Sequence, residues 1–207
     1  MITFHDRCLS YIRTFPQYPD SWPYVTPSGR MVYGKWMIGS LFGNDSRYYG
    51  AFPRGFVPRV RAMFPEVRSE AHILHLFSGG LPKGRYTRLD ALREPMPGIR
   101  PELVGSVYDL AELLAAKRAR ATFKLLIADP PYSAEDAGKY GQPALDKPRA
   151  MRSIAAAVPA GTHLVWLDTQ TPIFRGSEWH WWGDIDLHRS TGHRRRVVSF
   201  FERRAAA

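Results

Sequence analysis

The chain has 207 residues, 44% of them hydrophobic, so it can bury one complete core, whereas two full domains would be cramped. It carries 29 lysines and arginines against 19 aspartates and glutamates, and this net charge of +10 favours encounter with a polyanion, although it can also serve solubility alone. A single cysteine, Cys8, excludes an intramolecular disulfide and a cysteine-based zinc site, and no apolar run approaches the roughly 20 residues of a membrane span. We therefore expect a cytoplasmic protein that has no membrane partner.

Residues 1–70 are rich in proline, glycine and aromatic residues. Residues 24–26 and 31–37 flank Pro27-Ser28-Gly29-Arg30, which predicts a turn between two strands. Residues 56–64 predict a short helix that ends before Pro65. We interpret residues 1–70 as a cover segment that packs on a main domain spanning residues 71–207.

From residue 71 the chain alternates between strand and helix patterns. Residues 73–77 form an apolar run that stops at Ser78-Gly79-Gly80, as expected of a buried strand entering a tight turn. Helices are predicted over residues 110–118 and 149–158. Further strands are predicted over residues 86–90, 103–108, 123–128, 162–167, 183–188 and 195–201. This alternation indicates an α/β fold with a mainly parallel sheet and helices on both of its faces.

The tetrapeptide Asp129-Pro130-Pro131-Tyr132 follows the buried strand predicted over residues 123–128. In an open parallel sheet, ligands bind at the carboxyl ends of the strands. The two prolines fix their backbone and remove two amide donors, so the nearby carbonyls have no local competition. A carboxylate beside a rigid carbonyl is a receptor for an amino group with two hydrogens. The ring of Tyr132 adds a stacking surface for a planar base.

With these residues the sequence resembles the DNA amino-methyltransferases, a class I family that methylates adenine-N6 or cytosine-N4 and uses S-adenosyl-L-methionine as its cofactor. Phe77-Ser78-Gly79-Gly80 matches the motif on the family's first strand, and Asp129-Pro130-Pro131-Tyr132 matches the motif on its fourth. The resemblance covers about residues 71–203. It implies a Rossmann-like class I methyltransferase fold, with a seven-stranded, mainly parallel sheet, an antiparallel C-terminal strand and helices on both faces.

The resemblance also assigns roles to individual residues. Asp129, Pro130, Pro131 and Tyr132 become the catalytic residues. The cofactor-binding residues are Phe77, Ser78, Gly79 and Gly80 at its methionine end, Asp90 at the ribose hydroxyls, and Asp109 with the Leu110 amide at the adenine. No metal is expected, because His72, His75 and His163 lack the spacing of metal ligands.

Aspartate at position 129 favours adenine in DNA as the target, and the base would be flipped out of the duplex to reach the site. Cytosine-N4 in DNA, adenine in RNA, a protein amide side chain and a non-catalytic subunit of a larger complex remain as alternatives. Residues 133–148 predict only a short loop, so no target-recognition insert is visible. A second copy of the chain, a recognition subunit or the N-terminal segment would then have to supply sequence recognition.

Overall fold

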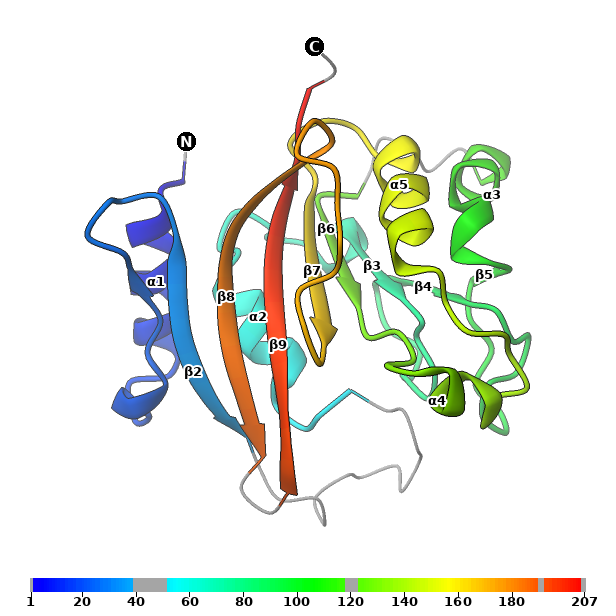
Figure 1. Cartoon of the computed structure of the whole chain (residues 1–207), viewed down its shortest axis with the longest axis horizontal. Helices are drawn as coiled ribbons and strands as arrows, with labels where there is room; N and C mark the ends of the chain where they lie inside the picture. Colours follow the sequence, from blue (N-terminus) through cyan, green and yellow to red (C-terminus); the bar gives the residue numbers. More distant parts are fainter. Residues whose placement is uncertain (1, 39–51, 118–122, 190–191, 206–207) are drawn as a thin grey trace.

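The computed structural model describes residues 2–38, 52–117, 123–189 and 192–205. Within these ranges the chain builds one nine-stranded sheet of order β1-β2-β8-β9-β7-β6-β3-β4-β5 (Figure 1). Its strands are β1 (Tyr24–Val25), β2 (Val32–Ile38), β3 (Ile73–Leu76), β4 (Thr87–Asp90), β5 (Leu103–Val104), β6 (Leu125–Ala128), β7 (His163–Asp168), β8 (Trp179–Arg189) and β9 (Gly192–Arg203).

Seven strands that are neighbours in this sheet confirm the predicted Rossmann-like α/β fold. In spatial order they are β8, β9, β7, β6, β3, β4 and β5. Strands β3 to β7 run parallel to one another, and β9 inserts antiparallel between β7 and β8. The sheet is two strands wider than predicted, because β2 pairs in parallel with β8 over its whole length and β1 pairs antiparallel with β2. Residues 24–38 of the N-terminal segment therefore add hydrogen-bonded strands to the sheet edge.

Helices lie on both faces of the sheet, as predicted (Figure 1). Side chains alternate along each strand, so that Ile73 of β3 joins the core beneath one helical layer and Leu74 joins the core beneath the other. One layer contains α1 (Phe4–Thr14) and α2 (Phe56–Ala62), and the other contains α3 (Leu110–Ala116) and α5 (Lys147–Ala157). None of the helices in the described ranges is both long enough and apolar enough to cross a bilayer.

Three elements differ from the sequence prediction. Helix α1 was not predicted; a capping box between Thr3 and Asp6 starts it, and Cys8 and Tyr11 lie on its buried side. Residues 133–148, predicted as a loop, contain the short helix α4 (Ala134–Gly138), which Ser133 caps. The strand predicted over residues 103–108 ends at Val104, because Ser106 caps a 3-10 turn. Arg118, at the end of the helix predicted over residues 110–118, lies outside the described residues.

A buried charge cluster joins α1 to the sheet. The Arg7 guanidinium donates hydrogen bonds to the Met63 carbonyl, at 2.9 Å, and to the Glu66 carboxylate. His163 at the start of β7 lies 3.4 Å from the same carboxylate. Burial by itself would raise the pKa of Glu66, but the hydrogen bonds from His163 and Arg7 outweigh it and lower that pKa to about 2. The cluster therefore stabilises the fold through the ionised form of Glu66.

We expect the substitution Glu66→Gln to lower the free energy of unfolding by about 1–3 kcal/mol at neutral pH. The pKa of Glu66 in the folded protein lies below the ordinary glutamate value of 4.5, so this contribution is complete above pH 4.5 and disappears as the pH falls toward about 2. Urea unfolding across this range should show the gap between wild type and variant closing with acidity. Glu70→Gln is the control, because its ion pair with Arg61 is exposed and should contribute little. A pH-independent gap would contradict the assignment.

Candidate active site

The turn after β3 carries an unusual backbone conformation at the first predicted site residue. Phe77 has φ of 56°, and it is the one residue other than glycine with positive φ in the ranges that the structure describes. A bulky side chain in this region is strained, and such strain clusters at functional sites. The Phe77 ring packs edge-on against Trp166 of β7, with ring centroids 6.1 Å apart. This contact links the turn after β3 to β7, the strand on the other side of β6 in the sheet.

The same turn is bonded directly to the end of β4. The Gly79 amide donates to one carboxylate oxygen of Asp90 at 2.8 Å, and the Leu92 amide donates to the other at 3.0 Å. Burial raises the pKa of Asp90. The Ser78 hydroxyl is buried and has no hydrogen-bond partner among the described residues. The structure therefore brings Ser78, Gly79 and Asp90 together, with Gly80 next in the turn.

Asp109 and Leu110 lie one strand farther out, where the chain enters α3. The loop that leads to them is tied to Asp90, because the Gly105 amide donates to the Asp90 carbonyl at 2.9 Å. Asp109 is exposed at the N-cap position and makes no capping bond with its side chain. The Leu110 side chain is fully buried in the core, which leaves only its backbone for a ligand. These two residues share an edge of the sheet with Asp90.

The loop after β6 holds the four predicted catalytic residues in one compact arrangement. The Tyr132 hydroxyl donates a hydrogen bond to the Asp129 carboxylate, so the loop closes on itself. The guanidinium of Arg196, from β9, lies over the Tyr132 ring at 4.5 Å from its centroid. Burial, followed by the charge of Asp129, holds the pKa of Tyr132 well above its usual range. Tyr132 is therefore a neutral hydrogen-bond donor to Asp129.

An ion pair behind this loop was not predicted. Asp168, at the end of β7, is fully buried and binds Lys147 of α5 at 2.7 Å, and Lys147 also donates to the Tyr132 carbonyl at 3.2 Å. The Trp166 indole and the Thr169 amide donate to the Asp168 carboxylate as well. The sequence held one signal for it: Asp168 lies where a strand ends, as Asp90 and Asp129 do.

Within the run Arg194-Arg195-Arg196, the side chains of Arg195 and Arg196 go to opposite faces of the sheet, as neighbours do in any strand. Arg196 reaches Tyr132, whereas Arg195 makes a two-pronged ion pair with Asp186 of β8. The side chain of Arg194 lies outside the described part of the structure. The run is therefore not one continuous basic patch.

Comparisons with known proteins add little to this geometry. No protein-family model and no curated protein matches the chain. Among solved structures, the chain is similar to TrmN from Thermus thermophilus, with 13% identity and a TM-score of 0.40. The similar region covers 63% of this chain and 43% of that one. The assignment of function therefore rests on the residues of the site.

We expect Lys147→Met to destabilise the protein by about 3–5 kcal/mol, because it leaves the fully buried Asp168 carboxylate without its cationic partner. Urea unfolding at neutral pH measures this loss. Arg100→Met serves as the control, since its ion pair with Glu94 joins side chains that are 71% and 44% exposed, so its loss should cost under about 1 kcal/mol. Equal effects of the two substitutions would remove the anchoring role from Lys147.

Proposed function

We propose that the chain is an S-adenosyl-L-methionine-dependent methyltransferase that methylates the exocyclic amino group of a nucleic-acid base, with adenine-N6 in DNA as the favoured target. The observation that carries this proposal is the Asp129 loop. Its carboxylate is held by Tyr132, its backbone is held by Lys147, and it lies at the same sheet edge as the bonded pair Gly79 and Asp90. A strained turn and a rigid acidic loop side by side are suited to a cofactor and an amine.

The residues after β3 and β4 fit S-adenosylmethionine, which when bound would supply an electrophilic methyl group. The Ser78 hydroxyl is an unpartnered buried polar atom within the described ranges, as expected of a group that bonds a ligand. Both carboxylate oxygens of Asp90 accept hydrogen bonds from backbone amides, and a carboxylate oxygen can accept further bonds from hydroxyl groups. The turn around Gly79 and Asp90 would therefore hold the cofactor, and the exposed Asp109 would reach its adenine amino group.

Asp129 and the rigid Pro-Pro backbone would activate the target amine. An exocyclic amino group is a poor nucleophile because its lone pair is delocalised into the ring. Hydrogen bonds from its two hydrogens to the Asp129 carboxylate and the Pro130 carbonyl would pull the nitrogen toward tetrahedral geometry and free that lone pair. After transfer, Asp129 would accept the proton or pass it to water. Catalysis of this kind consists mainly of positioning and electrostatic stabilisation.

Tyr132 would serve this site through both its ring and its hydroxyl. One face of the ring lies under the Arg196 guanidinium, so a flipped base stacks either on the opposite face or in place of Arg196. The hydroxyl donates to Asp129 and so fixes the direction of the carboxylate before any substrate arrives. The sequence analysis predicted a role for the Tyr132 ring and none for its hydroxyl. DNA is the proposed partner, and the surplus of positive charge supports binding to it.

Asp129→Ala should leave the affinity for S-adenosylmethionine almost unchanged and slow methyl transfer by about two to three orders of magnitude, because the carboxylate acts chiefly on the amine in the transition state. Single-turnover transfer of labelled methyl groups to DNA measures the rate, and calorimetry measures the affinity. Glu135→Ala, an exposed carboxylate on the neighbouring helix α4, is the control and should behave as wild type. A variant rate close to that of wild type would refute the role of Asp129.

Asp109→Ala should weaken S-adenosylmethionine binding roughly ten- to a hundredfold, because a hydrogen bond to a charged group is lost. The substitution should leave the fold intact, since Asp109 is exposed and makes no capping bond. Calorimetry on the variant and on Glu112→Ala, from the same first turn of α3, measures the difference. If both variants bind the cofactor as wild type does, Asp109 lies outside the cofactor site.

A further inference from the structure

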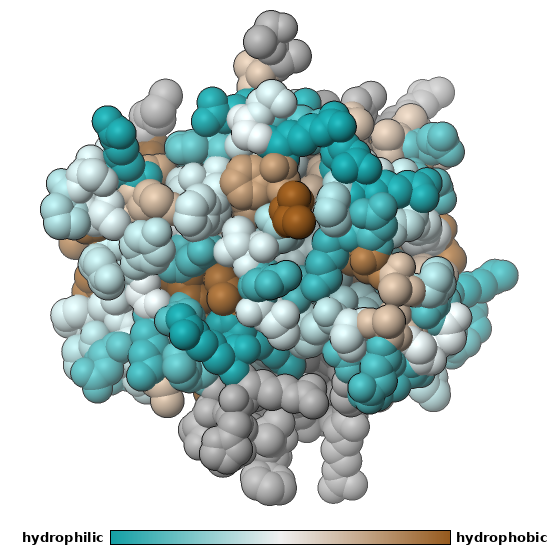
Figure 2. Space-filling view, viewed as in Figure 1, coloured by the Kyte–Doolittle hydropathy of each residue, from teal (hydrophilic) through white to brown (hydrophobic). Residues whose placement is uncertain are grey.

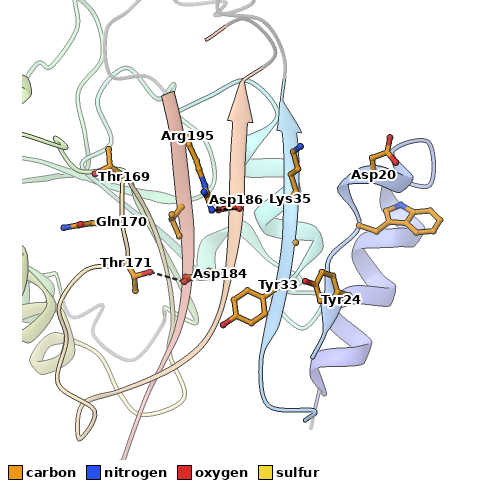
Figure 3. Close-up of a pocket in the computed structure, with 13 residues that line it drawn as sticks. Asp20, Tyr24, Tyr33, Lys35, Thr169, Gln170, Thr171, Asp184, Asp186 and Arg195 are labelled. Atoms are coloured by element: carbon orange, nitrogen blue, oxygen red, sulfur yellow. Dashed lines mark hydrogen bonds and ion pairs between the residues drawn. The ribbon is translucent and has the colours of Figure 1, made fainter. Parts of the chain in front are cut away.

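A groove of about 770 Å³ runs over β2, β8 and β9, beside the helical layer of α3 and α5 (Figure 3). Figure 1 shows these strands at the front of the molecule with no described helix drawn over them. We call this feature the side groove; its walls come from residues 20–24, from β2, β8 and β9, and from the loop over residues 169–171. Polar surface is prominent on this side of the molecule in Figure 2. The groove has the size of a ligand site.

Aromatic rings form one wall of the side groove. Tyr24 and Tyr33 are direct partners in the β1–β2 pair, so both side chains stand on the same face of the sheet. Tyr24 is 59% exposed and Trp22 is 37% exposed. The Trp22 indole is fixed in place by its hydrogen bond to the Phe15 carbonyl, at 3.1 Å. Fixed, exposed aromatic rings in a groove are a platform on which planar groups stack.

Fixed carboxylates form the floor. Asp184 accepts hydrogen bonds from the Thr171 hydroxyl at 3.0 Å and from the Trp181 indole at 3.1 Å, and burial raises its pKa. Asp186 is paired with Arg195 at 2.7 Å through both of its oxygens. The lining thus mixes anions and cations, which disfavours a channel for phosphates alone. It suits the edge of a nucleobase, which carries both donors and acceptors, because aspartate accepts hydrogen bonds from base amino groups.

The side groove starts where the candidate active site ends. Thr169 lines the groove and donates its amide to Asp168, whose partner Lys147 holds the Tyr132 carbonyl. A substrate strand with its target base at Asp129 would therefore continue past Thr169 into the groove. The wall of β1 and β2 is also the part of the sheet that exceeds the predicted seven strands. It would supply a recognition surface in a chain whose sequence shows no recognition insert.

We propose that the side groove binds an unstacked base next to the target in the substrate strand, with Tyr24 and Tyr33 as its stacking surface and Asp184 as a reader of its amino group. This inference rests on the proposed function for the nature of its ligand. It assigns sequence preference to the N-terminal strands, without a second subunit.

The test measures the affinity of the full chain for a fluorescent single-stranded DNA by anisotropy. Tyr24→Ala and Tyr33→Ala should each weaken binding about fivefold to a hundredfold, because one stacked base is lost. Tyr33→Phe should bind as wild type. Tyr18→Ala is the matched control, since Tyr18 is 46% exposed on the same N-terminal segment and does not line the groove. Thermal melting of each variant shows whether the fold is intact. Tyr24→Ala is the substitution least prone to disturb the fold, because Tyr24 lies at the surface.

Unchanged affinity in the folded Tyr24→Ala variant, or equal losses in Tyr18→Ala and Tyr24→Ala, would overturn the inference. The proposed function is judged separately, by methyl transfer in Asp129→Ala. If Asp129→Ala abolishes transfer while the groove variants bind DNA normally, the side groove alone is wrongly assigned. If the groove variants lose affinity while wild type transfers no methyl group to any nucleic acid, the methyltransferase proposal fails and the groove remains a nucleic-acid site.

Discussion

The candidate active site depends on the register of three parallel strands. Leu76 and Ala128, the last residues of β3 and β6, pair with each other, and Ala128 also pairs with Trp166 of β7, which continues to Asp168. The residues that follow, Phe77 and Asp129, therefore emerge side by side. A slip of one residue would turn the core side chains to the opposite face of the sheet, and the buried faces on both sides forbid it. The strained turn, the acidic loop and the Lys147–Asp168 ion pair all rest on this alignment.

Local patterns predicted most of the fold. Short apolar runs marked β3, β6 and β7 because these strands are buried on both faces. The pairing of β2 with β8 escaped prediction, since it joins residues about 150 positions apart and no local pattern encodes such a pairing. Helix α1 escaped because proline and aromatic residues dominate the segment around it, although the capping pair Thr3 and Asp6 was readable. Local sequence propensity predicts helices and strands better than it predicts which strands pair with one another.

The residues of the candidate active site were also predicted only in part. Motif residues could be placed on strand ends from the sequence, and the structure brings Gly79 to Asp90 and Tyr132 to Asp129. The contacts that hold them come from distant segments: Arg196 lies over Tyr132 from β9, and Lys147 joins the Tyr132 carbonyl to Asp168. Such groups give no sequence signal of their own, because any surface arginine or lysine resembles them. The side groove is of the same kind, since five separate segments line it.

The central claim is that this arrangement transfers a methyl group to a base amine. The most direct measurement incubates the full chain with methyl-labelled S-adenosylmethionine and, in separate reactions, unmethylated DNA and RNA. The nucleic acid is then digested to nucleosides, which are identified by mass spectrometry. The account predicts label in N6-methyldeoxyadenosine from DNA; label in methylated cytosine or in RNA adenosine would keep the chemistry and change the substrate. Absence of label from every nucleoside, by a chain that melts cooperatively, would contradict the account.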